Sequence, residues 1–185
     1  MARNADETRR KILDAATEEF ARHGIAGARV DRITKNAGVN NALLYRYFGS
    51  KIDLFDAVYS RLVLDTVDAV PMDPADLPDY AGRLYDYYES HPDVVRLAAW
   101  RQLERPEQEL PEAVHEGYRA RTDKIAQAQR DGLIPDAMSA AELRDLMILL
   151  SLSNTPLMPA MGSAIDRKRR RATIVAAAAA VLRSG

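Results

Sequence analysis

The sequence contains no cysteine, no long apolar run and no recognisable export signal. Without cysteine, a disulfide framework, a thiolate nucleophile and a cysteine-ligated metal site are all excluded. The longest apolar run, Ile174 to Leu182, has nine residues, far fewer than the ~20 that a membrane-spanning helix needs. The opening residues lack the apolar centre of a signal peptide. We therefore expect a cytoplasmic protein that does not enter the membrane.

Catalytic motifs are also missing. The sequence has no G-x-S-x-G, H-E-x-x-H or dinucleotide-binding glycine pattern, and Gly49-Ser-Lys51 lacks the upstream glycine of a phosphate-binding loop. The three histidines, His23, His91 and His115, are too dispersed to indicate a metal site or a catalytic triad. We expect no enzyme activity, cofactor or metal, although 27 carboxylates leave a catalytic acid pair open.

The charge is unevenly distributed along the chain. Residues 1–52 contain ten Lys and Arg against six Asp and Glu, whereas residues 53–185 contain 16 against 21. The first third of the chain is basic and the remainder is acidic. This indicates that only the first third binds a polyanion. A local excess of this size also arises by chance, so charge alone does not decide the matter.

Apolar residues recur at helical spacing throughout, and strand patterns are nearly absent. This predicts an all-α protein of about nine helices. The first is expected over 6–23 with Asp6 as its N-cap, and a short second helix should end at Gly38. Asn40 and Ser50 are expected to cap the third and fourth.

A proline-rich stretch, residues 70–79, indicates a joint between two domains, predicted at 1–66 and 67–185. After it, helices are expected at about 79–90, from 92 through Trp100, and over 107–131, 139–153 and 164–183. Ser139 and Glu142 have the spacing of a capping box.

Residues 29–48 have the pattern of a helix-turn-helix. Gly38 permits the sharp turn, and Val39 fills the angle between the two short helices. The predicted inner face consists of Ile33, Ala37, Val39, Leu44 and Phe48, and the outer face of Asn41, Ala42, Tyr45 and Arg46. Such an outer face suits a DNA major groove. The alternative from these residues alone is a plain helical bundle with a polar surface.

At this point the sequence resembles the tetracycline-repressor (TetR) family of transcriptional regulators. The resemblance covers about residues 6–66 and depends on Ala37-Gly38-Val39, Leu44-Tyr45-x-x-Phe48 and Ser50-Lys51. It implies an all-helical homodimer with an N-terminal DNA-binding lobe and a C-terminal lobe for ligand binding and dimerisation.

The resemblance also implies roles for individual residues. Asn40 and Asn41 begin the recognition helix, where Asn41 is the candidate for reading a base. Tyr45, Tyr47 and Lys51 occupy positions that commonly touch phosphate in the family.

Three positions depart from the family pattern. Ala28-Arg29 stands where a threonine pair usually caps the second helix and contacts phosphate, so that contact is expected to be either lost or replaced by Arg29. Ala42 replaces a common glycine, and Asp31-Arg32 inverts the usual order of charges.

A basic cluster at the chain start suggests either a flexible DNA-binding arm, with Arg3 as its foremost contact, or a solvated helix face.

The C-terminal domain carries three further predictions. Its last two helices are apolar with too little chain left to pack on, which predicts a four-helix dimer interface containing Leu143, Met147, Leu150, Ile174, Ala178 and Val181. A monomer core is the alternative. A small-molecule pocket is expected among Tyr85, Tyr88, Trp100, Tyr118 and Met158. The basic run 167–171 is expected to be a solvated face, paired with the acidic residues of 65–79.

The resemblance implies a ligand-responsive repressor that binds a palindromic double-stranded DNA operator as a homodimer. Its effector is an unknown small molecule. The alternative function is a helical small-molecule binder or enzyme that has lost DNA binding.

Overall fold

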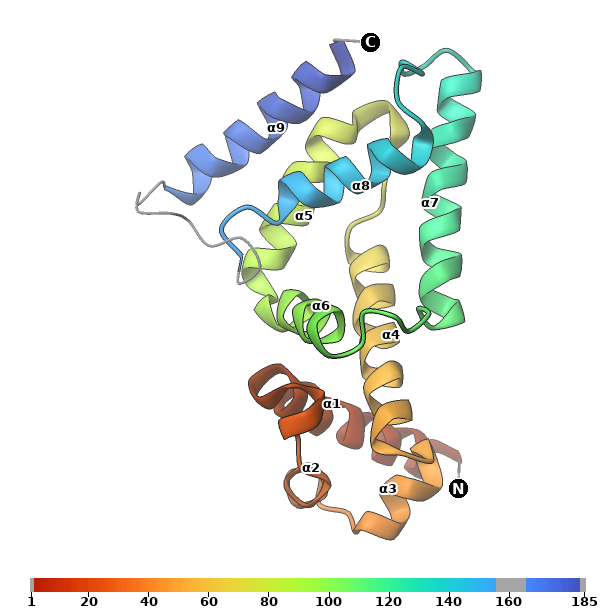
Figure 1. Ribbon diagram of the computed structural model, residues 1–185, viewed down its shortest axis with the longest axis vertical. Helices are drawn as coiled ribbons and strands as arrows, with labels where there is room; N and C mark the ends of the chain where they lie inside the picture. The colour runs from red at the N-terminus through yellow and green to blue at the C-terminus, as the bar shows by residue number, and fades with distance from the viewer. Residues whose placement is uncertain (1, 156–165, 184–185) are drawn as a thin grey trace. The chain divides into compact units, whose positions relative to one another are not determined.

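The computed structural model describes residues 2–155 and 166–183, with the backbone alone for Ala2 and Arg3. These residues form nine α-helices and one short 3-10 helix, and no strand occurs among them (Figure 1). The all-α prediction is confirmed. None of the described helices combines the length and apolar character needed to cross a bilayer.

The chain folds into two compact units that do not follow chain order. The first contains Met1–Val63 and Arg96–Pro111, and the second contains Leu64–Val95 and Glu112–Gly185. Helix α4 (Lys51–Ala69) and helix α6 (Pro92–Glu104) therefore each contribute to both units. The functional division at residue 66 stays a prediction.

The first unit has a continuous apolar core beneath its short helices. Helices α1 (Ala2–Gly27), α2 (Val30–Ala37) and α3 (Asn41–Phe48) pack with the start of α4. Fully buried side chains in this unit include Ile12, Phe20, Ile33, Leu44, Leu54, Phe55 and Val58. The rings of Phe20 and Phe55 meet edge to face, with centroids 5.2 Å apart. Burial of each such side chain contributes about 1.5–3 kcal/mol.

Helix α1 is longer than predicted. It begins at Ala2, so Asp6 lies inside the helix and is not its N-cap. The helical path is interrupted at Gly24, where φ is 69°, near the predicted end. The extra turn continues to Gly27.

The second half of α6 is fastened to α1 within the first unit. The indole Nε1 of Trp100 donates to the carbonyl of Ala21 at 3.2 Å. The carboxylate of Glu104 accepts from the backbone N–H of Ala26 at 2.8 Å. The bond from Trp100 satisfies a carbonyl near the end of α1, where helix carbonyls lack partners of their own.

The second unit is built around helix α5 (Leu77–Ser90), which follows a 3-10 helix at Pro74–Asp76. Helix α5 packs against α8 (Ala140–Ser151) and α9 (Arg167–Arg183), and α7 (Glu112–Arg130) packs against α8 (Figure 1). Fully buried side chains in this core include Leu77, Tyr80, Leu84, Tyr85, Ile125, Met147 and Ala178.

Two sequence predictions about these helices have clear outcomes. Helix α7 begins at Glu112 and not at 107, because Pro111 lacks an N–H and disfavours helical backbone in the residue before it. The capping box is confirmed: Ser139 and Glu142 each bond the backbone N–H of the other.

Helices α5 and α9 approach closely at Gly82. A Cβ at this position would lie 2.8 Å from Val175 Cγ2, so a larger residue would force the helices apart. Beside it, Arg171 pairs with Asp79 and Asp86, each at 2.8 Å. The basic run thus binds acidic groups of its own unit, as expected for Asp79, whereas Asp86 lies beyond the predicted acidic stretch.

Candidate DNA-binding surface

The turn between α2 and α3 forms through local signals. Gly38 has the left-handed conformation (φ 68°, ψ 34°) that favours glycine. The N–H of Val39 then donates to the carbonyl of Thr34 at 3.0 Å. Asn40 caps α3, since its side-chain oxygen accepts from the N–H of Leu43 at 2.8 Å. The predicted helix-turn-helix and its cap are therefore present.

The two short helices each have one buried and one exposed face. Ile33, Ala37, Leu44 and Phe48 are buried, and Val39 is half-buried. The opposite side of α3 exposes Asn41, Ala42, Tyr45 and Arg46. Burial of one face fixes the direction of the other, so α3 presents these four residues to solvent.

The amide of Asn41 is engaged by α2. Thr34 Oγ1 donates to Asn41 Oδ1 at 2.7 Å, and Asn41 Nδ2 donates to Asp31 Oδ1 at 2.8 Å. Thr34 is 4% exposed, so this end of the link lies beneath the surface. In this state Asn41 braces α3 against α2, and its amide would have to release these bonds to read a base.

Lys51 and Tyr47, both expected at phosphates, are bonded to α1. Lys51 Nζ donates to the carbonyls of Ala26 and Ala28, both at 3.2 Å. Such a cation satisfies the free carbonyls at a helix end. The Tyr47 hydroxyl donates to the carbonyl of Ala5 at 3.2 Å. These two side chains hold the ends of α3 and α4 against α1.

Glu19 supplies the cap that the sequence lacks at the start of α2. Its carboxylate, 5% exposed, accepts from the backbone N–H of Arg29 and from Arg32 Nε, both at 2.8 Å. Burial acts to raise the pKa of Glu19, but the bonds from Arg32 and Arg29 outweigh it and lower that pKa. The Arg29 side chain remains largely exposed, 3.8 Å from Asp31. Sequence reasoning missed Glu19, which lies on a different helix from the group it caps.

The predicted flexible arm is not found. Arg3 lies within α1, which is helical from Ala2 onward, and its side chain is outside the described residues. Further along this helix, the guanidinium of Arg9 lies over the Phe48 ring at 5.3 Å.

The predicted pocket residues are not all in one unit. Tyr85 is fully buried in the second unit, where Tyr88 and Tyr118 are half-buried. Trp100 belongs to the first unit, bonded to α1. Met158 lies outside the described residues.

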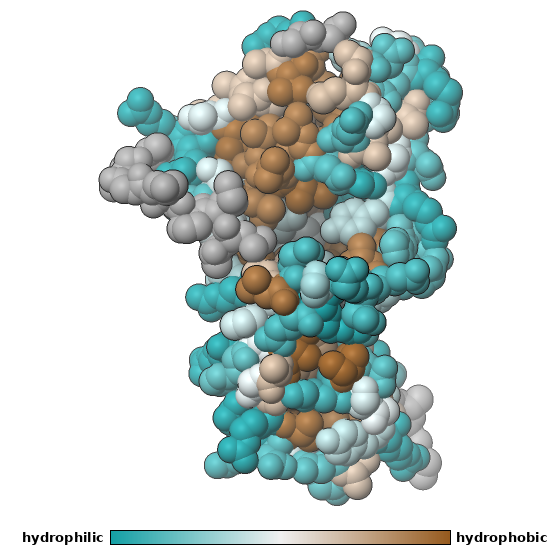
Figure 2. Space-filling view, viewed as in Figure 1, coloured by the Kyte–Doolittle hydropathy of each residue, from teal (hydrophilic) through white to brown (hydrophobic). Residues whose placement is uncertain are grey.

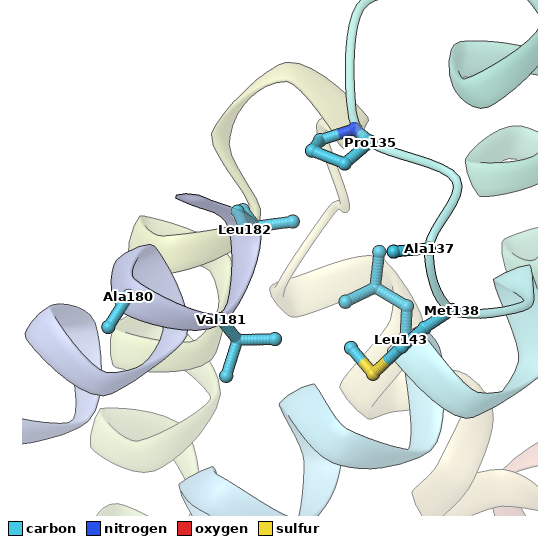
Figure 3. Close-up of a pocket in the computed structure, with 7 residues that line it drawn as sticks. All are labelled: Pro135, Ala137, Met138, Leu143, Ala180, Val181 and Leu182. Atoms are coloured by element: carbon cyan, nitrogen blue, oxygen red, sulfur yellow. The ribbon is translucent and has the colours of Figure 1, made fainter. Parts of the chain in front are cut away.

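An apolar pocket of about 340 Å³ lies elsewhere in the second unit (Figure 3). Its walls come from the loop before α8, from α8 and from the end of α9; they are Pro135, Ala137, Met138, Leu143, Ala180, Val181 and Leu182. None of the predicted pocket residues lines it.

The predicted dimer residues divide into two groups. Leu143, Met147, Ile174 and Ala178 are buried in the core of their own unit. The premise that the last helices have too little to pack on is therefore wrong for these four, because α5 covers them. Leu150 and Val181 are only half-buried. Figure 2 shows apolar side chains gathered on the surface over α8 and α9, where Leu149 is 55% exposed.

Comparison with known proteins identifies the family. The model described as bacterial regulatory proteins of the tetR family matches residues 12–58. The model of the tetracyclin repressor-like C-terminal domain matches residues 76–180. The chain belongs to the TetR family. The resemblance inferred from the sequence is thus confirmed, and the chain is a helix-turn-helix DNA-binding transcriptional regulator.

Individual relatives agree with this assignment. The HTH-type transcriptional repressor SCO4008 of Streptomyces coelicolor is 40% identical over 155 residues, which cover 83% of this chain and 80% of the relative. The HTH-type transcriptional repressor NicS of Pseudomonas putida is 33% identical over 69% of this chain and 58% of its own. The crystal structure of the putative transcriptional regulator SCO4942 of Streptomyces coelicolor has a TM-score of 0.81 at 37% identity, covering 94% and 97% of the two chains.

Proposed function

We propose that this TetR-family regulator is a ligand-responsive repressor that binds a palindromic operator as a homodimer. One observation carries the proposal: the exposed face of α3, with Ala42, Tyr45 and Arg46, lies on a helix whose other face is buried and whose ends are bonded to α1 and α2. A recognition helix must be held rigidly to match a groove. The two relatives named as repressors, SCO4008 and NicS, support the sign of regulation.

The residues proposed to contact DNA fall into two groups, those with exposed side chains and those already bonded to α1. Arg29, Asn40, Ala42, Tyr45 and Arg46 are exposed and available to phosphates and base edges. Tyr47 and Lys51 act chiefly by placing α3, although an ammonium has three donors and can still bind a phosphate. Arg3 remains a proposed backbone contact.

The proposed dimer forms through the outer sides of α8 and α9. The surface residues Leu149, Leu150 and Val181 replace the buried ones as its candidates. Two copies would place their recognition helices in successive major grooves, ~34–36 Å apart. An effector bound in the second unit would favour a dimer in which the distance between the two recognition helices no longer matches successive major grooves.

Selection from random duplex DNA tests the function. The full chain should retain fragments containing two inverted half-sites, and its affinity should fall steeply as salt increases, because phosphate contacts release counterions. Leu149→Glu should shift sedimentation toward the monomer, whereas Leu103→Glu, at a 73% exposed leucine of the first unit, should not. A chain that retains no duplex even in dilute salt would refute the proposal.

A further inference from the structure

Arg121 lies inside the second unit. It is on the side of α7 that also carries Val114, Ile125 and Ala128, all of them buried. Their intervals of seven, four and three positions place them on one helix face. Arg121 is only 7% exposed, so a permanent positive charge lies at a position that otherwise suits an apolar side chain.

No carboxylate pairs with this guanidinium in the part of the chain that the structure describes. Its Nη2 atom is buried without a hydrogen-bond partner. The residues outside the description, 1, 156–165 and 184–185, include no Asp or Glu side chain. An acidic side chain of this chain is therefore not the missing partner.

The hydroxyl of Tyr80 lies beside Arg121. Tyr80 is 1% exposed, and its oxygen has no hydrogen-bond partner among the described residues. Burial raises the pKa of Tyr80, and the charge of Arg121 and its hydrogen bonding to the hydroxyl oppose the rise. The Tyr80 hydroxyl on α5 and the Arg121 guanidinium on α7 are thus neighbours inside the unit.

Two neighbouring arginines of the same unit do have carboxylate partners. Arg83 lies over the Tyr80 ring at 6.0 Å and pairs with Asp79 at 2.9 Å. Arg144 lies over the Tyr118 ring at 5.3 Å and pairs with Asp145 at 2.7 Å. Of these three arginines, Arg121 alone has no carboxylate partner among the described residues.

We propose that Arg121 and Tyr80 bind the carboxylate of an effector with an apolar body. A buried cation without a partner is costly, and an anion with hydrogen-bonding oxygens removes that cost. A carboxylate matches a guanidinium fork and one hydroxyl, whereas a phosphate brings more charge and oxygens than these two donors satisfy. Leu77 and Leu84 lie three and four positions from Tyr80 on α5, and Ile125 lies four positions from Arg121 on α7; all three are fully buried and give the site an apolar environment. This inference rests on the proposed ligand response and specifies the chemical class of the effector.

A first experiment needs no ligand. Arg121→Met keeps the aliphatic part of the side chain without its charge, so the melting temperature of the free full-length protein should rise by roughly 2–4 °C. Arg144→Met, which removes a paired arginine, should lower it. If Arg121→Met melts lower than the wild type or fails to fold, the guanidinium is structural and the inference is wrong.

A second experiment uses benzoate and octanoate, with benzamide and octanamide as neutral counterparts at matched ionic strength. At least one acid should raise the melting temperature of the wild type and release a selected DNA fragment, and it should do neither in Arg121→Met. Equal shifts from acid and amide, shifts retained in Arg121→Met, or no shift from either acid would overturn the carboxylate site. Retention of DNA by the untreated wild type tests the proposed function separately.

Discussion

Glu19 in the first unit and Arg121 in the second are almost equally buried, at 5% and 7% exposed, yet their surroundings differ. Glu19 accepts bonds from two neighbours on α2, whereas Arg121 has no carboxylate among the described residues. A satisfied buried charge fixes the groups around it, and an unsatisfied one favours any partner that supplies the missing bonds. Glu19 therefore positions the start of α2, whereas Arg121 stays available for the proposed ligand.

Removal of Glu19 should have the largest effect on the comparison. Glu19→Ala leaves the N–H of Arg29 without its acceptor and frees Arg32, so we expect a loss of about 2–3 kcal/mol of unfolding free energy. Urea titration followed by circular dichroism measures it. Glu18→Ala, one position earlier and exposed, is the control and should change stability by less than about 0.5 kcal/mol. Equal losses in the two variants would show that Glu19 has no special role.

The brace at Asn41 extends the comparison to the DNA-binding face. Asn41→Ala should weaken binding by about tenfold, or ~1.4 kcal/mol, to the selected operator and its single-base variants alike, because α3 loses its link to α2. Thr34→Val breaks the same link from a buried position, so it should reproduce the effect. Binding to a panel of altered fragments tests both. A changed preference at one base pair, seen only in Asn41→Ala, would instead identify Asn41 as a base-reading residue.

Arg171 sharpens the comparison within the second unit because it is a paired arginine. Arg171→Met should cost about 1 kcal/mol near neutral pH, as both of its pairs are partly exposed. The hydrogen bond from Arg171 lowers the pKa of Asp79, so this stabilisation is present above the ordinary aspartate pKa of about 3.9. It is lost as pH falls through the lowered value. The difference between the variant and the wild type, measured by urea titration at several pH values, should therefore shrink below about pH 4; a constant difference would contradict the pairing.

Much of the first unit could be predicted from the sequence because its signals are local. Asn40, Ser50 and Gly38 act on backbone groups within a few residues, and Leu44 and Phe48 are placed inward by helical spacing alone. The same holds for the capping box of α8. Where a local signal was absent, as at the start of α2, prediction missed the cap, since Glu19 reaches it from another helix.

Predictions about long side chains on the surface were less complete. Asn41 and Lys51 have the residue types and positions of DNA contacts, but each is bonded to a neighbouring helix. Trp100 has the character of a pocket residue, but it belongs to the first unit. In the last two helices, four of the six residues assigned to the dimer are covered by α5, a helix about sixty or more residues earlier in the chain.

The sequence by itself determined the helices, their caps and the helix-turn-helix pattern, because each depends on residues within about one or two turns of one another. Only the tertiary structure decided which polar side chains were already occupied and which stayed without a partner. Hydrogen bonds and ion pairs depend on atoms a few ångströms apart in space, and the segments that bring those atoms together are separated by tens of residues along the chain.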